Sequence, residues 1–139
     1  MGKGADMAIG QAGSITTNSP GENDPITITF DEPLTDPVIA LSATSNGGHP
    51  YTLRVTDITY DTDGNATSFT FIMEEWEYLD GPHPATETIN WIAIEEGVHT
   101  LPDGRIIEAG TTSATHTTSS VSLAGGFSDP PVILTSVMS

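Results

Sequence analysis

Turn-forming residues recur so often in this chain that no long helix fits between them. Ten prolines and fourteen glycines are spread over 139 residues, among many threonines and serines. No amphipathic run of eleven residues survives between these residues, so the periodicity of a helix is absent. A chain of this length favours one domain with a single core. The sequence therefore predicts one all-β domain.

Two stretches in the middle of the chain carry the clearest strand pattern. In residues 68–77 (SFTFIMEEWE), two phenylalanines and a methionine fall on every second position, so all three face one side of a strand. Residues 86–95 (TETINWIAIE) have apolar side chains on both sides, which is typical of a central strand. The connection at residues 81–84 contains two prolines, which favour a turn. We therefore expect the two stretches to pair as an antiparallel hairpin.

Shorter segments complete the predicted fold. Alternation predicts strands from Ile26 and Tyr51, with a bulge or a strand end near Asp57, and residues 38–41 fit an inner strand. Residues 98–107 form a small hairpin closed by a Pro-Asp-Gly turn. We expect an antiparallel β-sandwich of about six core strands plus extra C-terminal strands, divided into an N-terminal segment (1–25), the sandwich (26–97) and a tail (98–139). The core candidates are Ile28, Phe30, Val38, Leu53, Val55, Phe69, Phe71, Ile89, Trp91 and Ala93.

The C-terminal residues repeat an earlier part of the chain. Residues 121–139 align without a gap on residues 28–46, at an offset of 93 positions. Residues 121–123 and 132–137 are then strands of a second module that have no partners within the chain. Chance similarity, a tail that folds back onto its own sandwich and a segment that ends within a repeat are the alternatives. The candidate assembly residues are Val121, Leu123, Phe127, Val132 and Leu134.

The charge of the chain excludes some partners. Three basic residues stand against nineteen acidic ones, a formal charge of −16, so nucleic acid and anionic membranes are repelled. No apolar stretch approaches the roughly 20 residues of a membrane helix, and the N-terminus lacks a signal-peptide core. Such a surface suits a salty or calcium-rich medium, although it also serves solubility alone. We expect an extracellular or cell-surface protein, with a virion protein as the alternative.

One acidic loop is a candidate calcium site. Asp61, Asp63 and Asn65 alternate as oxygen ligands around Gly64, as in short calcium loops. The loop lacks the closing glutamate of an EF-hand, and its Asp-Gly pair equally predicts a plain hairpin turn. Calcium is therefore a possible cofactor, and no other is indicated. Cysteine is absent, which excludes disulfides and thiolate metal sites.

Residues 26–95 resemble a known family, the H-type lectin domain. The resemblance is carried by a strand ending in Phe30, the Pro37-Val38 corner, Arg54, and Trp76 seven residues after a phenylalanine. A strand ending Trp-Ile-Ala-Ile at residues 91–94 completes the pattern. The resemblance implies a six-stranded sandwich, often trimeric, that binds galactose-type sugars in grooves between subunits. It also extends to tandem modules of large extracellular bacterial proteins.

The resemblance also implies a binding site. Arg54 and Trp76 fall on family positions that contact the sugar, whereas Glu77 replaces the residue, often histidine, that usually follows the tryptophan. An aromatic face can meet a sugar ring while polar groups bind its hydroxyls. Packing of Trp76 at the end of the sandwich is the alternative. The candidate sugar-binding residues are Arg54, Trp76, Glu77, Tyr78 and His83.

The sequence gives little support to an enzyme. No serine nucleophile motif or phosphate-binding loop is present, and the four histidines lack metal-binding spacing. We expect a non-catalytic carbohydrate-binding or adhesion module that forms a homo-oligomer, with glycans or copies of itself as partners. The alternative is a structural subunit of a filament, surface appendage or phage particle that assembles through its C-terminal tail by strand exchange.

Overall fold

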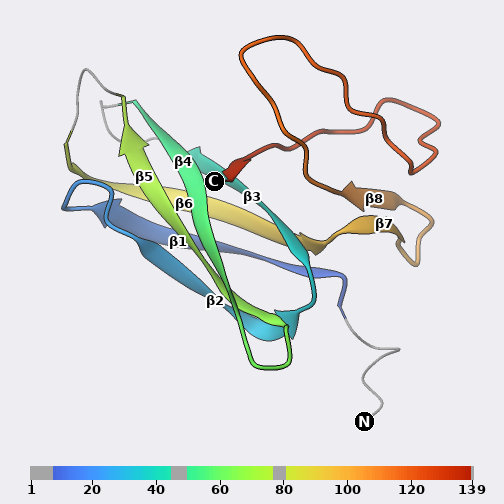
Figure 1. The fold of residues 1–139 in the computed structure, drawn as a ribbon, viewed down its shortest axis with the longest axis horizontal. Helices are drawn as coiled ribbons and strands as arrows, with labels where there is room; N and C mark the ends of the chain where they lie inside the picture. Colours follow the sequence, from blue (N-terminus) through green and yellow to red (C-terminus); the bar gives the residue numbers. More distant parts are fainter. Residues whose placement is uncertain (1–7, 45–49, 77–80, 139) are drawn as a thin grey trace.

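The computed structural model of the chain describes residues 8–44, 50–76 and 81–138. Within these ranges every regular element is a β-strand, and none of them contains a helix that could span a membrane. Two sheets pack face to face as a β-sandwich, and a small hairpin stands beside them (Figure 1). The predicted all-β sandwich is confirmed.

The first sheet has three strands in the order β1-β6-β3. Strand β6 (His83–Glu95) lies in the middle and pairs antiparallel with β1 (Gly10–Ser19) on one side and β3 (Pro37–Thr44) on the other. The prediction of a central strand over residues 86–95 is thus confirmed. Strand β1 pairs with β6 along nearly its whole length, so the sandwich that the structure describes begins at Gly10.

The second sheet has four strands in the order β2-β5-β4-β9. Strand β5 (Ala66–Glu75) lies between β2 (Ile26–Leu34) and β4 (Tyr51–Tyr60), and the short β9 (Val137–Met138) adds to β4 in parallel. The pairing of β4 with β5 shifts register between Val55 and Asp57, where the sequence predicts a bulge. Six core strands, three from each sheet, therefore form the sandwich.

The expected hairpin between residues 68–77 and 86–95 is wrong. Strands β5 and β6 follow each other in the chain but belong to different sheets, so the connection crosses from one sheet to the other. Strand β6 already begins at His83 and includes Pro84. Proline is tolerated there because it lies at the start of the strand. Two strong strand patterns joined by a proline-rich link do not reveal whether the strands share a sheet.

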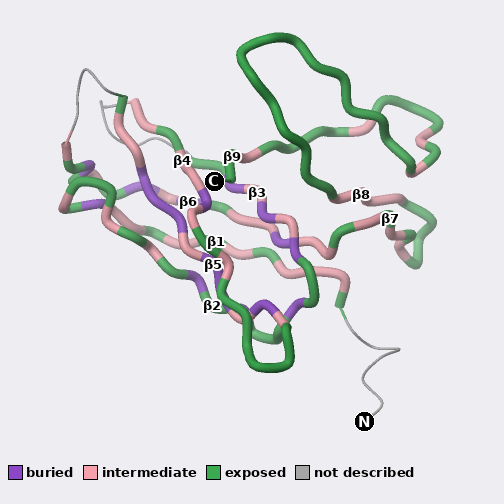
Figure 2. The backbone as a smooth tube through the Cα atoms, viewed as in Figure 1, coloured by how far each residue is buried: buried purple, intermediate pink, exposed green. Residues whose placement is uncertain are grey.

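The core lies between the two sheets (Figure 2). Phe69 and Phe71 are fully buried, and Trp91 packs against Phe30 and Phe69 with ring centroids 6.0 and 5.6 Å apart. Most predicted core residues are confirmed as buried or packed against the core. The prediction of Val38 as a core residue is wrong by one position. The inward position of β3 is Ile39, which is only 2% exposed.

A second hairpin and a long tail follow the sandwich. Strands β7 (Gly97–Thr100) and β8 (Ile106–Ala109) pair antiparallel, which confirms the predicted hairpin and its Pro-Asp-Gly turn. The tail beyond β8 leaves the hairpin in a wide loop and returns to the open side of the sandwich (Figure 1). There the Ser136 hydroxyl accepts the Leu41 N–H at 2.6 Å. The strands expected at residues 121–123 and 132–136 are not formed, and only β9 is.

Candidate functional site

The outer face of the β4-β5 pair carries an ion pair. The Arg54 guanidinium donates from Nε and from one terminal nitrogen to the two carboxylate oxygens of Glu74, at 3.2 and 3.1 Å. The two residues lie diagonally across the strands, since Arg54 is opposite Ile72. Both side chains remain about one third exposed. This two-point geometry fixes the plane of the guanidinium at the surface.

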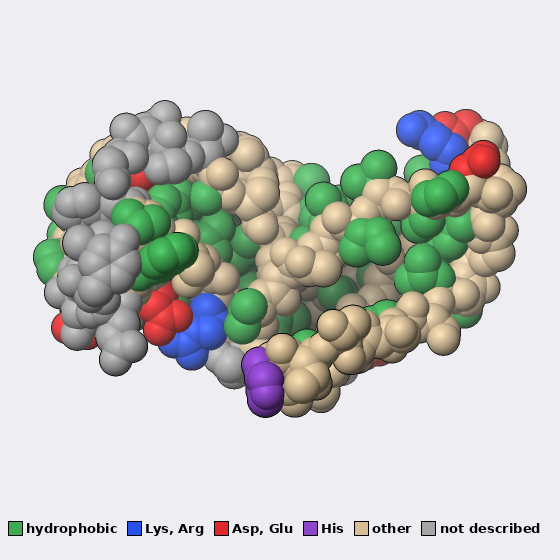
Figure 3. All heavy atoms as spheres, turned by 90° about the horizontal axis from the view of Figure 1, so that it is seen from above, with side chains coloured by type: hydrophobic (Ala, Val, Ile, Leu, Met, Phe, Trp, Pro, Cys, Tyr) green, Lys and Arg blue, Asp and Glu red, His purple; other side chains and the backbone are tan. Residues whose placement is uncertain are grey.

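Trp76 follows directly after β5 and is 52% exposed. It stands two residues after Glu74 in the chain, just beyond the end of the strand that carries the ion pair. Figure 3 shows basic side chains at two separate places, each beside an acidic one. Arg54 and Arg105 each form an ion pair, with Glu74 and Asp103 respectively. Glu77 and Tyr78 lie outside the described residues.

His83 does not belong to this surface, and its prediction as a sugar-binding residue is wrong. Its imidazole is buried between two carboxylates, with Nδ1 2.8 Å from Glu75 and Nε2 3.0 Å from Glu87. The three side chains are at most 2% exposed. A proline on either side of His83 suggests an exposed turn, but the residue is the first of β6 and points inward.

The buried histidine meets a carboxylate at each of its two ring nitrogens. Buried polar groups are tolerated when they are hydrogen-bonded, and all three side chains meet this condition. The cluster of Glu75, His83 and Glu87 is thus a polar part of the core that joins β5 to β6.

Tyr51 completes this cluster. Its ring lies against the His83 imidazole with centroids 4.5 Å apart, and its hydroxyl is buried without a hydrogen-bond partner among the described residues. Burial, and then the negative charge of Glu87, raise the pKa of Tyr51 to about 12. Tyr51 lies directly opposite Glu75 in the β4-β5 pairing, which explains why the two side chains enter the core together.

Sequence reasoning did not identify the buried cluster, although a signal for it exists. The odd-numbered positions of β5 and β6 point inward, as Phe69, Phe71 and Ile89 show. Extending that alternation to the ends of both strands places Glu75, His83 and Glu87 on the same inward face. Charged side chains usually lie at the surface, but at these three positions the alternation of the strands predicts the observed burial correctly.

The proposed calcium ligands lie in the turn between β4 and β5. One carboxylate oxygen of Asp61 accepts the N–H groups of Asp63 and Asn65, both at 2.9 Å, and Gly64 has a φ of 83°. This is the arrangement of an Asx-type turn, in which the aspartate stabilises the backbone. In the described parts of the chain no three acidic or histidine side chains are placed to hold a metal. Calcium binding at this turn stays a prediction.

The proposed assembly residues lie in the tail, and most of their side chains are exposed to solvent. Val121 is 59% exposed, Leu123 45%, Val132 91% and Leu134 66%, whereas Phe127 is half-buried. Glu108 of β8 anchors this tail, since its two carboxylate oxygens accept the N–H groups of Ala124 and Gly125 at 2.9 Å. The exposed apolar side chains therefore belong to a segment that is held by its backbone.

Comparisons of the chain with protein-family models, with curated proteins and with solved structures found no match.

Proposed function

We propose that this chain is an extracellular, non-catalytic module that binds carbohydrate or mediates adhesion. The observation that carries the proposal is the exposed indole of Trp76 just after β5, two residues beyond Glu74 of the surface ion pair with Arg54. An indole face can cover the apolar side of a sugar ring, while a guanidinium and a carboxylate exchange hydrogen bonds with its hydroxyls. The resemblance to the H-type lectin domain supports it, because both Arg54 and Trp76 match sugar-contacting positions.

The arrangement indicates how such a site selects its ligand. Because Glu74 holds the guanidinium in one plane by two hydrogen bonds, the polar groups of this pair have fixed positions at the surface. Fixed polar groups give orientation and specificity, whereas the indole provides most of the buried area. We expect a homo-oligomer, as in the family that the chain resembles, so that several weak sites act together.

Substitution of Trp76 tests the proposal. On a glycan array, we expect Trp76→Ala to lower binding about tenfold or more, because the stacking surface is removed, without changing the unfolding midpoint. Tyr60→Ala is the matched control, since Tyr60 is a similarly exposed aromatic, 47%, at the opposite end of β4. Absence of binding to any glycan, with and without calcium, would contradict the proposal, as would equal binding by both variants.

A structural subunit is the second candidate function. The observation in its favour is the row of exposed apolar side chains at Val132, Ile133 and Leu134, which are 91, 65 and 66% exposed. Contiguous apolar surface of this kind marks interaction sites. In this function the tail of one chain adds to the sandwich of another, and the assembled state of the full chain distinguishes the two functions.

A further inference from the structure

The repeat in the tail covers more of the fold than its last strands. Besides the match of residues 121–139 to 28–46, residues 106–111 (IIEAGT) align on residues 9–14 (IGQAGS) at an offset of 97. The first match covers the equivalents of β2 and β3, and the second covers the start of β1. The difference of four positions corresponds to a shorter connection between the first two strands. The tail thus repeats the order β1, β2, β3.

In both copies, a side chain of the first segment is hydrogen-bonded to the backbone at equivalent positions of the second segment, although the groups that donate and accept differ in part. In the first copy, the Gln11 amide accepts the Asp31 N–H at 2.8 Å and donates to the Glu32 carbonyl at 2.6 Å. In the tail, Glu108 takes the place of Gln11 and binds the N–H groups of Ala124 and Gly125. These two residues are the equivalents of Asp31 and Glu32 at the offset of 93. A three-dimensional contact therefore recurs at the positions that the alignment predicts.

The equivalents of core residues are uncovered in the tail. Phe30, Ile39 and Leu41 are 6, 2 and 9% exposed in the sandwich, whereas their counterparts Leu123, Val132 and Leu134 are 45, 91 and 66% exposed. In the first copy, β2 pairs with β5 and β3 pairs with β6. Among the described residues, none pairs with residues 121–134 as β5 and β6 pair with β2 and β3 in the first copy. This explains why residues 121–134 keep the apolar positions of the first copy but form no strand.

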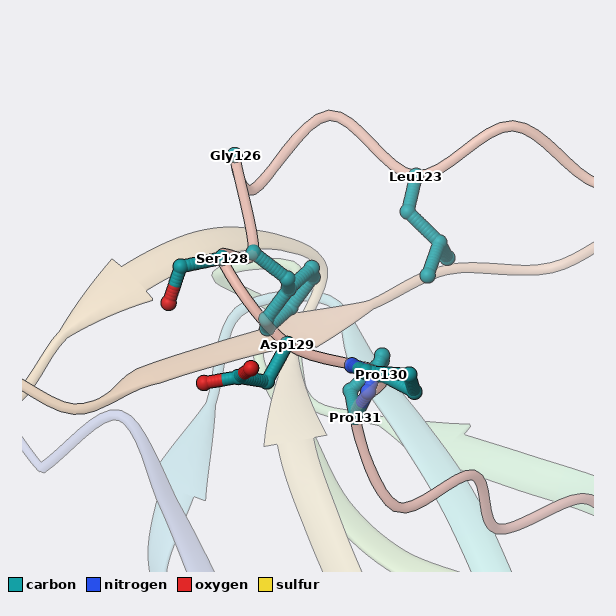
Figure 4. Close-up of a pocket in the computed structure, with 7 residues that line it drawn as sticks. Leu123, Gly126, Ser128, Asp129, Pro130 and Pro131 are labelled. Carbon is teal, nitrogen blue, oxygen red and sulfur yellow. The ribbon is translucent and has the colours of Figure 1, made fainter.

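A hollow of about 390 Å³ in the tail marks where a missing strand would end. Figure 4 shows this hollow, with Leu123 apart from Ser128 and Asp129. The residues that line it are Leu123, Gly126, Phe127, Ser128, Asp129, Pro130 and Pro131. In the first copy, the N–H groups of Thr35 and Asp36 bind the carboxylate of Glu95, at the end of β6, at 2.6 and 3.1 Å. Ser128 and Asp129 are their equivalents.

We propose that residues 106–138 are an acceptor half of a second sandwich. The partner that fits it is a three-stranded polypeptide segment built like β4, β5 and β6, whose last strand ends in a carboxylate. Its strands cover Leu123, Val132 and Leu134. The side-chain carboxylate at the end of its last strand, the equivalent of Glu95, binds the N–H groups of Ser128 and Asp129. The tail in this arrangement receives strands and does not donate them, which differs from strand exchange by the tail into a neighbouring sandwich.

A fusion protein tests the proposal directly. Residues 47–97 are appended to the full chain after Ser139, because Ser139 aligns on Asn46. We expect amide hydrogen exchange at residues 121–134 to slow at least tenfold, since these residues gain ladder partners. The matched control is the same fusion with the appended equivalents of Phe71 and Ile89 changed to Asp, which cannot form a core. Equal exchange in the fusion, the control and the 139-residue chain would overturn the proposal.

A cross-link provides a second readout that requires little folded protein. Ile39 is opposite Ala93 in the pairing of β3 with β6, so Val132→Cys should meet a cysteine at the appended equivalent of Ala93. The chain has no cysteine of its own, so any disulfide reports this pair. We expect oxidation to cross-link this variant, and not the matched variant with Ile133→Cys, which points to the other face. No cross-link, or an equal one at both positions, would overturn the proposal.

Discussion

At the scale of single residues, His83 joins two buried carboxylates through its two ring nitrogens. Replacing it by alanine removes this contact from both Glu75 and Glu87 in the core. Removing one partner of a buried ion pair typically costs about 3–5 kcal/mol of unfolding free energy. We expect His83→Ala to lose that much in urea denaturation. The exposed His116→Ala is the control and should change nothing. A loss below about 1 kcal/mol would place His83 outside the core.

Tyr51 gives the same region a response to alkaline pH. Its pKa is raised to about 12 in the folded protein from the usual value of 10. Its contribution to stability is therefore complete below pH 10 and is lost as pH rises from 10 to 12, because the unfolded chain ionises first. Tyr51→Phe keeps the ring against His83 and removes a buried hydroxyl without a partner, so it should gain about 1 kcal/mol at neutral pH.

The measurement for Tyr51→Phe is the free energy of unfolding between pH 8 and 12. The difference between the variant and the original chain should grow through the window from pH 10 to 12, because the variant has no phenol to ionise at this position. Other tyrosines titrate equally in both proteins and cancel in the difference. Two parallel stability curves would contradict the assignment.

At the scale of elements, the closest fit is between β1 and β6. A Cβ placed on Gly13 would lie 2.7–2.8 Å from three atoms of the Trp91 indole, which packs on Phe30 and Phe69. We expect Gly13→Val to displace the indole, with a loss of about 1–3 kcal/mol in stability and a shift in tryptophan fluorescence. Ala12→Val, on the exposed neighbour, is the control. An unchanged emission spectrum in Gly13→Val would contradict this packing.

The sequence predicts the strands whose inward-facing side chains alternate clearly with outward-facing ones. It does not predict which strands pair with one another. Alternation correctly predicts Phe69, Phe71 and Met73 as core, because each aligned side chain reinforces the same phase. The run of residues 38–41 is apolar on both faces, so phase is undetermined there and Ile39 was missed in favour of Val38. Which strands become neighbours depends on contacts across the core, which no local pattern encodes.

The candidate site could be predicted only in part, because its contacts also depend on which strands are neighbours. Arg54 and Trp76 both retain exposure at the surface, where the resemblance places a ligand. The pairing of Arg54 with Glu74 depends on the β4-β5 register, and that register is set by a bulge whose length the sequence does not specify. To predict that His83 is buried, one would need to know that β6 starts six residues before the apolar run at Ile89.

At the scale of the whole molecule, the exposed apolar side chains of the tail allow the proposed self-association to be tested. If the second candidate function holds, light scattering on the full chain will show polymers at high concentration. The variant with Val132→Asp and Leu134→Asp should then be monomeric, because charge is introduced into the apolar row. Val98→Asp, at an exposed valine of the hairpin, is the control. A full chain that stays monomeric would contradict the structural-subunit function, and it would also contradict the homo-oligomer that we expect of the carbohydrate-binding module.

The order of strands in the two sheets also determines when the chain can fold during its synthesis. Among the six core strands, β4 and β5 are the only consecutive pair that share a sheet, and the tight turn at residues 61–65 brings them together first. Strands β1 and β3 have no partner until β6 has been made, and β2 must wait for β5. Non-local pairing of this kind slows folding, because long loops must close before contacts form. A ribosome that has released only the first sixty residues therefore holds four strands, β1 to β4, whose edges have no partner yet, and unpaired strand edges of this kind favour non-native association at that stage.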